Sequence, residues 1–334
     1  MFVRSFRCLP GESSSAVPAV FGVFPVKAVP QSRQFFGVIP GQQQFRSIRS
    51  SVVLIIVARF ETHLATRYVQ PLREGGSLPA VVDTESGGMF VVKFRGAGQG
   101  VKALIAELIV GSLARNAGLP TPEIALIEIL DEFGRTEPDP EIQDLLRASH
   151  GINFGARYLD GAFNFDANAA ADLISPDLAA KIVWFDAFVS NPDRTHRNPN
   201  LMVCSRKPYL IDHGAALYVQ HDWASVNLER TRSAFPLIKD HVLLRIAGDM
   251  RVADMEMSEA LNDDVIRDVI AAVPDDLFKS PALVSDFSSP DEARARYSEY
   301  LTARRAEPRA FVDEAINAHD RALRTPPLRV SSRR

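Results

Sequence analysis

Short strand-forming runs followed by longer helix-forming runs constrain the fold of this 334-residue chain more than any other feature. Between residues 52 and 130, apolar and β-branched runs alternate with glycine-containing turns at residues 73–79 and 86–88. A helical pattern interrupts them at residues 101–117 and ends at Gly118, a residue type that commonly follows a helix. Tight turns between strands favour antiparallel pairing, so we expect an antiparallel sheet with one helix.

Beyond residue 130 the spacing of apolar residues is mainly helical. The helices that it predicts cover residues 139–147, 175–189, 237–247, 258–273, 290–305 and 310–323. Two short runs, 201–204 and 209–211, predict a hairpin among them. We therefore expect an α+β fold with a small sheet lobe over residues 52–130 and a larger, mainly helical lobe over residues 131–325. A basic tail follows at residues 326–334.

The first sixty residues differ in composition from the rest of the chain. They hold seven basic residues and one acidic residue, and they are rich in Ser, Gln and Pro. They show neither a strand nor a helix period, and no signal-peptide core is evident. We expect residues 1–51 to be disordered or not a genuine part of the protein, and we assign no chemistry to them.

Charge and cysteine content exclude several classes of protein. The net charge of −3 offers no global field that would attract nucleic acid, and Cys8 and Cys204 cannot build a disulfide framework. The longest uncharged apolar run, at residues 51–58, is far below the roughly 20 residues that a membrane-spanning helix needs. The seven histidines lack the spacing of a zinc site. We expect a cytoplasmic protein that binds neither nucleic acid nor membrane.

The strongest chemical signal lies on a loop after the predicted helix at 175–189. Asp193 is followed five residues later by Asn198, and Asp212 comes just after the predicted hairpin. Phosphoryl transfer needs such a set, because one carboxylate orients the attacking hydroxyl while an amide oxygen and a second carboxylate hold Mg²⁺ against the phosphates. The alternative is a pair of structural turns in which Asp and Asn side chains bind the backbone.

Lys93 stands in an apolar strand run, and Glu107 follows it by fourteen residues, at the edge of the buried face of the predicted helix. A strand lysine held by a helix glutamate positions nucleotide phosphates in protein kinases. Alone, the two residues fit a solvated surface ion pair better. Together with the downstream Asp193, Asn198 and Asp212, they favour a nucleotide site.

Two glycine-rich loops compete for contact with phosphates. Gly75, Gly76 and Ser77 lie between the first strands, where backbone N–H groups can cover phosphates. Gly98 and Gln99 lie in the loop that opens the predicted helix, and a helix N-terminus favours anions. Either loop can also be a plain tight turn.

Taken together, these runs resemble a HipA-like kinase domain. The runs that carry the resemblance are residues 73–79, 92–100, 193–195, 198–200 and 210–214. The resemblance covers about residues 52–235 and implies a two-lobed, protein-kinase-like fold that transfers the γ-phosphate of ATP, usually to Ser or Thr of a protein. By position, it implies that Lys93 contacts phosphates, Asp193 is the catalytic base, and Asn198 and Asp212 bind Mg²⁺.

The chain departs from the kinase pattern at several positions. His213 stands where eukaryotic-type kinases have Phe, and Asn191 and Pro192 replace His-Arg before Asp193. We also expect the additional N-terminal subdomain of HipA toxins to be absent, so the resemblance does not extend to partner binding or toxicity.

The sequence therefore predicts ATP- and Mg²⁺-dependent phosphotransfer to a protein hydroxyl, with an acceptor that it does not identify. The alternatives are a small-molecule kinase on the same fold and a nucleotide-binding pseudokinase that acts as an adaptor. We expect the hinge between the lobes at residues 127–130. The turn-like run at residues 149–155 is expected to be a loop of the large lobe, structural or on the substrate side. The sequence indicates no oligomeric state.

Overall fold

The computed structural model describes residues 60–72, 78–135, 137–166 and 171–324. Every described residue belongs to one compact unit, Ile55–Arg334. Several expectations lie outside the described residues: the extension at 1–51, the strand run up to residue 59, the phosphate loop of Gly75, Gly76 and Ser77, and the tail at 326–334.

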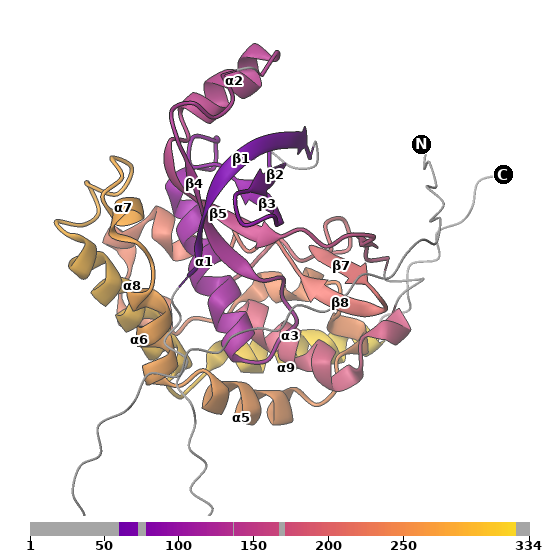
Figure 1. Cartoon of the computed structure of the whole chain (residues 1–334). Helices are drawn as coiled ribbons and strands as arrows, with labels where there is room; N and C mark the ends of the chain where they lie inside the picture. The colour runs from indigo at the N-terminus through magenta and orange to yellow at the C-terminus, as the bar shows by residue number, and fades with distance from the viewer. Residues whose placement is uncertain (1–59, 73–77, 136, 167–170, 325–334) are drawn as a thin grey trace, which may run out of the picture. The chain divides into compact units, whose positions relative to one another are not determined.

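Five strands form a closed barrel in the order β1-β2-β3-β5-β4 (Figure 1). They are β1 (Thr62–Pro71), β2 (Ala80–Thr84), β3 (Met89–Lys93), β4 (Ile124–Ile129) and β5 (Gly151–Arg157). Val82 on β2 and Val92 on the neighbouring β3 are both fully buried. Both are β-branched residues, whose side chains pack well on a pleated surface. Neighbouring strands are antiparallel except β1 and β4, which run parallel. This parallel pair departs from the purely antiparallel sheet that the sequence predicts.

Strand β5 corrects two expectations about the chain beyond residue 130. Residues 149–155 are predicted as a loop of the large lobe, but β5 inserts between β3 and β4. Its glycines make the segment resemble a turn in the sequence. Gly155 is nevertheless required in the strand, because a Cβ there would lie 2.5 Å from Cγ1 of Ile127 on β4. The barrel thus extends to Arg157, so a boundary at residue 130 would divide it. Of the residues expected at the hinge, 127–129 belong to β4, and Leu130 follows the end of that strand.

Helix α1 (Gly100–Asn116) lies between the barrel and the helical part of the chain. It contacts β4 and β5 on one side and α6 on the other (Figure 1). Almost every residue from Val101 to Ala114 is buried, as expected for a helix that is covered all round. The predicted helix is confirmed, and Gly118 follows it with a φ of 74°.

A second, three-stranded sheet has the order β6-β7-β8 and contains the predicted hairpin. Its strands are β6 (Phe163–Asn164), β7 (Leu201–Cys204) and β8 (Lys207–Leu210). Leu201 pairs with Leu210, so the residues just before β7 and just after β8 meet at the same end of the hairpin. That end carries the candidate site.

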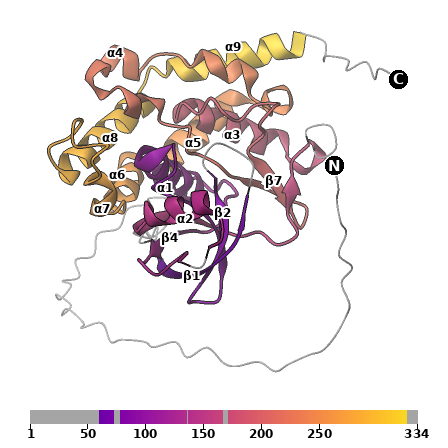
Figure 2. The ribbon, with the colours of Figure 1, turned by 90° about the horizontal axis from the view of Figure 1, so that it is seen from above.

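The remaining helices form the rest of the fold. They are α2 (Pro140–Arg147), α3 (Pro176–Phe188), α4 (Leu228–Thr231), α5 (Met250–Ala260), α6 (Asp263–Ala271), α7 (Asp275–Phe278), α8 (Pro290–Arg305) and α9 (Ala310–Arg324). Helix α3 packs against α5 and α9 (Figure 2). The Trp184 ring stacks on Phe188, with 5.2 Å between the ring centroids. It contacts Phe311 of α9 edge-on, with 5.5 Å between the centroids. Within the described part of the chain, no helix is long and apolar enough to cross a membrane.

Two of the predicted helices are wrong in their extent. Residues 237–247 hold two short 3₁₀ segments, Pro236–Asp240 and Leu244–Ile246, instead of one α-helix. The predicted helix at 258–273 is divided between α5 and α6, because the Asn262 side chain accepts hydrogen bonds from two backbone N–H groups and starts α6 anew.

Candidate active site

Lys93 ends strand β3 and joins the barrel to the hairpin sheet. Its Nζ lies 2.5 Å from Glu107 Oε1 and 2.5 Å from Asp212 Oδ1. The lysine is 7% exposed, so the pair with Glu107 is a buried contact and differs from the solvated surface pair that the sequence leaves open. Burial acts to lower the pKa of Lys93, but the two carboxylates outweigh it and raise the pKa above its ordinary value. The ammonium group is therefore charged.

Glu107 holds both Lys93 and the backbone after β8. Its Oε1 accepts from Lys93, and its Oε2 accepts the backbone N–H of His213 at 3.0 Å. The carboxyl group is 1% exposed on α1, and burial raises its pKa above the ordinary value while Lys93 opposes the rise. One carboxylate thus fixes the lysine strand and the segment of Asp212 relative to each other.

Asp212 follows β8 in a backbone conformation that few non-glycine residues adopt, with a φ of 57°. Its side chain is 40% exposed and remains reachable from solvent. Burial would raise the pKa of Asp212, but the Lys93 ammonium outweighs that effect and holds the pKa below its ordinary value. Gly214 is close-packed, because a Cβ there would lie 3.2 Å from Glu107 Oε1. Asp212 is therefore an ionised and accessible carboxylate.

Asp193 lies in the loop between α3 and β7, where amide groups hold it. Its Oδ2 accepts from Asn198 Nδ2 at 2.8 Å and from Asn200 Nδ2 at 3.1 Å. Its backbone N–H donates to Asn191 Oδ1 at 3.1 Å. The loop and the hairpin bring Asp193 near Asp212, since the backbone N–H of Ile211 donates to the Asn200 carbonyl at 3.1 Å.

A buried ion network behind this loop is absent from the sequence prediction. Arg194 is 1% exposed; its Nε donates to Asp186 Oδ2 at 2.6 Å, and its Nη1 donates to the carbonyl oxygens of Asn200 and Ile211. His241 donates from Nε2 to the same Asp186 oxygen at 2.9 Å, because its Nδ1 accepts the N–H of Leu243. The arginine thus ties together the two ends of the hairpin that carry the site.

The charges in this network keep the Asp186 carboxyl ionised. Burial would raise the pKa of Asp186, but Arg194 and His241 hold it well below the ordinary range. The signal that could have identified it is a single acid within the apolar run of α3, between Phe185 and Ala187. A buried carboxylate of this kind requires partners, although the sequence does not say which.

His213 is the departure from the kinase pattern closest to Asp212. Its side chain is buried, and neither ring nitrogen has a hydrogen-bond partner among the described residues. Burial, together with the nearby Arg194 charge, lowers the pKa of His213 to about 3. The imidazole is therefore neutral.

In the glycine loop before α1, Gly96 is closely packed, whereas Gly98 has space for a side chain. The Gly96 N–H donates to Ser149 Oγ at 3.2 Å, and a Cβ there would lie 2.7 Å from the Ala148 Cβ. Gly98 has open space around its Cα. Gln99 precedes the first turn of α1, and its Oε1 lies 3.7 Å from where a Gly214 Cβ would be. The Gln99 side chain therefore reaches the segment after Asp212, whereas Gly96 packs against the turn before β5.

The donor set suits a hard divalent cation that is shared with phosphates. Asn198 offers an amide oxygen and Asp212 an ionised carboxylate, and Mg²⁺ is commonly held by one or two such groups together with phosphate oxygens. The described residues contain no cluster of three or more His, Cys, Asp or Glu side chains that would hold a metal ion by themselves. By the chemistry of their oxygen donors, Asn198 and Asp212 fit an ion of this kind.

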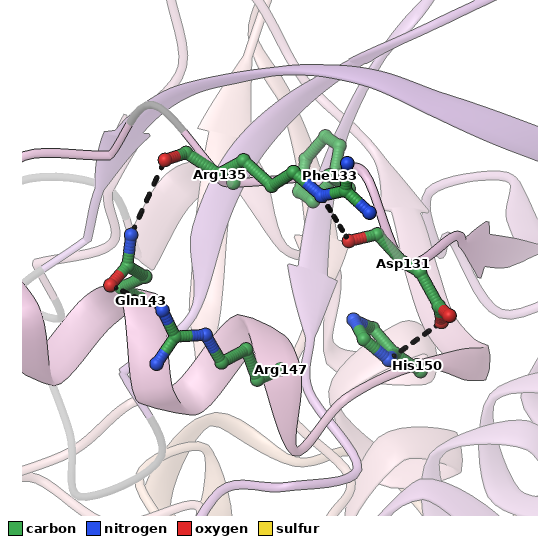
Figure 3. Close-up of a pocket in the computed structure, with 7 residues that line it drawn as sticks. Asp131, Phe133, Arg135, Gln143, Arg147 and His150 are labelled. Carbon is green, nitrogen blue, oxygen red and sulfur yellow. Dashed lines mark hydrogen bonds and ion pairs between the residues drawn. The ribbon is translucent and has the colours of Figure 1, made fainter.

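A cavity of about 500 Å³ lies elsewhere, at the turn between β4 and α2 (Figure 3). It is lined by Asp131, Phe133, Gly134, Arg135, Gln143, Arg147 and His150. Asp131 lies 2.9 Å from His150 Nδ1, and the Arg135 Nε donates to the Asp131 carbonyl at 3.3 Å. The lining combines acidic and basic groups and includes none of the site residues that the sequence predicts.

Comparison with known proteins identifies a family for this chain. A model of the family described as HipA-like kinase matches residues 66–286. The crystal structure of the proinflammatory kinase CtkA from Helicobacter pylori is similar at 13% identity and a TM-score of 0.45, covering 79% of this chain and 98% of that chain. No curated protein matches the sequence. The family match spans well over half of the chain and contains Lys93, Asp193 and Asp212, so the chain belongs to the HipA-like kinase family.

Proposed function

We propose that this protein is an ATP- and Mg²⁺-dependent kinase that transfers the γ-phosphate to a serine or threonine hydroxyl of a protein. The observation that carries the proposal is the buried Lys93, whose ammonium is held by Glu107 and Asp212 at 2.5 Å each. A lysine between a helix glutamate and a metal-binding aspartate is the arrangement that places phosphates in kinases. Family membership supports the same activity.

The proposal includes a two-lobed arrangement of the fold. The barrel with α1 forms the small, nucleotide-binding lobe, and the hairpin sheet with the remaining helices forms the catalytic lobe. Lys93 and Glu107 come from the first, whereas Asp193, Asn198 and Asp212 come from the second. Gly98 and Gln99 at the start of α1 would add backbone N–H groups toward the phosphates.

In the reaction that we propose, Asp193 receives the proton of the acceptor hydroxyl. The hydroxyl oxygen forms a bond to the γ-phosphorus, the bond from that phosphorus to the β,γ-bridging oxygen breaks, and ADP leaves with the electron pair. Lys93 binds phosphate oxygens, and Asn198 with Asp212 would hold Mg²⁺. When bound, the metal ion neutralises charge on the phosphates. Glu107 keeps Lys93 in place throughout the reaction.

Nucleotide binding must rearrange one contact. Lys93 and Asp212 are bonded to each other here, and each would exchange part of that contact for a phosphate oxygen or the metal ion. Glu107 can retain Lys93 during the exchange, because it accepts from the lysine through Oε1 and from the backbone N–H of His213 through Oε2. Of the two ion pairs of Lys93, only the one to Asp212 therefore has to open.

The test is transfer of ³²P from [γ-³²P]ATP with Mg²⁺ to bacterial cell proteins and, separately, to a panel of hydroxyl-bearing metabolites. We expect label on serine or threonine of protein with the wild type and loss of label with Asp193→Asn. Asp264→Asn, a change at a side chain that is 71% exposed on α6, is the matched control and should transfer normally.

The other outcomes assign other functions. Label in a metabolite alone would make the protein a small-molecule kinase. Binding of Mg·ATP without transfer to any acceptor or to water would make it a nucleotide-binding adaptor. Either result would overturn the proposed protein kinase activity.

A further inference from the structure

Two asparagines bind the same oxygen of Asp193, although the kinase pattern assigns a role to one of them. Asn198 Nδ2 donates to Asp193 Oδ2 at 2.8 Å, and Asn200 Nδ2 donates to it at 3.1 Å. Among the described residues, none donates a hydrogen bond to Asp193 Oδ1. The carboxylate therefore has one oxygen held by amides and one oxygen available to a hydroxyl.

The two asparagines differ in how firmly they are placed. Asn198 is exposed, whereas Asn200 is 8% exposed. The Asn200 carbonyl accepts hydrogen bonds from Arg194 Nη1 and from the backbone N–H of Ile211. Its backbone is also in the left-handed region, with a φ of 47°. Asn200 is thus anchored by groups on both sides of the hairpin end, and its amide is the more fixed of the two.

This difference separates two tasks that one asparagine would otherwise share. A side chain that supplies an oxygen to Mg²⁺ must adjust its amide plane to the ion, and that adjustment competes with a fixed hydrogen bond to Asp193. Asn200 takes no part in such a contact and can keep Asp193 Oδ2 in place while Asn198 turns toward the metal ion. Asp193 Oδ1 then stays available to an acceptor hydroxyl while Oδ2 is held by Asn200.

We infer that Asn200 is a positioning residue that fixes Asp193 for proton transfer, leaving Asn198 to the metal ion. The inference rests on the proposed phosphotransfer. It extends that function by assigning to Asn200 a task that the Asp193, Asn198 and Asp212 pattern does not contain. Arg194 supports this role by donating a hydrogen bond to the Asn200 carbonyl, and Asp186 in turn binds Arg194.

The test variant is Asn200→Gly, which removes the amide and suits the left-handed backbone at this position. Ser205→Gly is the matched control, because Ser205 has a φ of 49° in the turn at the other end of the same hairpin. Basal hydrolysis of Mg·ATP by water is the measured activity, so no acceptor has to be known. Calorimetric titration gives the Kd for Mg·ATP, and urea unfolding of each variant checks the fold.

We expect Asn200→Gly to lower kcat by about 10- to 100-fold, the range for a misplaced catalytic group, and to leave the Kd for Mg·ATP within about twofold. Asn200→Asp keeps the shape but cannot donate, and it should lose at least as much activity. Asn198→Ala should instead weaken binding of Mg·ATP. Ser205→Gly should match the wild type in all three measurements.

A double variant separates positioning from a merely structural role. In the Asp193→Asn background, Asn200→Gly should cause no further loss of the residual activity, because the group that it positions is already gone. An equal loss in both backgrounds, or a kcat unchanged by Asn200→Gly, would overturn the inference while the kinase proposal stands. A wild type that binds Mg·ATP and never turns it over would overturn both.

Discussion

Lys93 Nζ and Asp212 Oδ1 lie 2.5 Å apart, although 119 positions separate the two residues along the chain. The contact joins the last residue of β3 to the first residues after β8. Both groups are the ones that a nucleotide with its metal ion would engage. The same two residues therefore hold the barrel against the hairpin sheet and form the centre of the candidate site.

Replacing Lys93 by Met should affect both stability and turnover. Glu107 is then left buried without its cation, and breaking a buried pair by removing one partner destabilises a fold by about 3–5 kcal/mol. The double variant Lys93→Met/Glu107→Gln should recover much of that loss and remain inactive. Urea unfolding and Mg·ATP hydrolysis measure the two effects. A double variant as unstable as Lys93→Met alone would contradict the pairing as the source of the loss.

The two aspartates should differ in nucleotide binding. Asp193→Asn keeps volume and removes the proton acceptor, so Mg·ATP binding should persist while kcat falls by about 10²–10⁴-fold. Asp212→Asn removes a charged oxygen ligand and should weaken Mg²⁺-dependent binding as well as turnover. Calorimetric titration with and without Mg²⁺ distinguishes them. The reverse pattern would exchange the roles of base and metal ligand.

Two glycines of the loop before α1 should respond differently to an added methyl group. Gly96→Ala places a Cβ 2.7 Å from the Ala148 Cβ and should lower the free energy of unfolding by about 1–3 kcal/mol. Gly98→Ala meets open space and should change it by less than about 0.5 kcal/mol. If the Gly98 N–H binds phosphate as we propose, Gly98→Ala should raise the Kd for Mg·ATP. Thermal or urea unfolding with titration of the same samples tests both statements.

The His241 environment predicts a loss of stability in mild acid. Burial lowers the pKa of His241 in the folded protein, although Asp186 opposes the effect, so the unfolded chain takes up the proton first. The free energy of unfolding should therefore fall as pH drops below about 6.5, by up to about 1.4 kcal/mol per pH unit from this group. Asp186, whose pKa is depressed, loses its contribution only at much lower pH.

The variant His241→Gln isolates this contribution, because a glutamine amide can donate to Asp186 and does not titrate. It should be less stable than the wild type at pH 7.5, yet its stability should fall less steeply between pH 6.5 and 5.5. Urea unfolding at several pH values gives both slopes. If the free energy of unfolding fell equally steeply with pH in the two proteins, His241 would already be protonated in the folded state, which would contradict the prediction.

The sequence predicts the parts of the site whose signals are local. The spacing of Asp193 and Asn198, and the position of Asp212 after a short hairpin, depend on a few neighbouring residues and on one turn. Lys93 and Glu107 also lie within one strand–helix unit. The predicted starts of α2 and α3 agree with the structure because Asp139 and Ser175 cap them through their own side chains.

The parts that sequence reasoning missed depend on distant partners. Arg194 has no role in the sequence prediction, because its buried contacts are with Asp186 on α3 and with a carbonyl group after β8. Asn200 has no role of its own in the sequence prediction, because its contact with Asp193 depends on how the loop folds before the hairpin. Strand β5 carries glycines that weaken its strand signal, and the close approach of Ile127 that requires Gly155 belongs to another strand.

The order of strands in the barrel has a consequence for how the protein is made. Strand β5 lies between β3 and β4, yet it is the last of the five strands to leave the ribosome. Until residues 151–157 emerge, β3 and β4 each expose an unpaired edge, and such edges are where growing chains pair wrongly with one another. A fragment that stops within α2 should therefore self-associate, and only a chain that extends past Arg157 can close the barrel beside its own lysine strand.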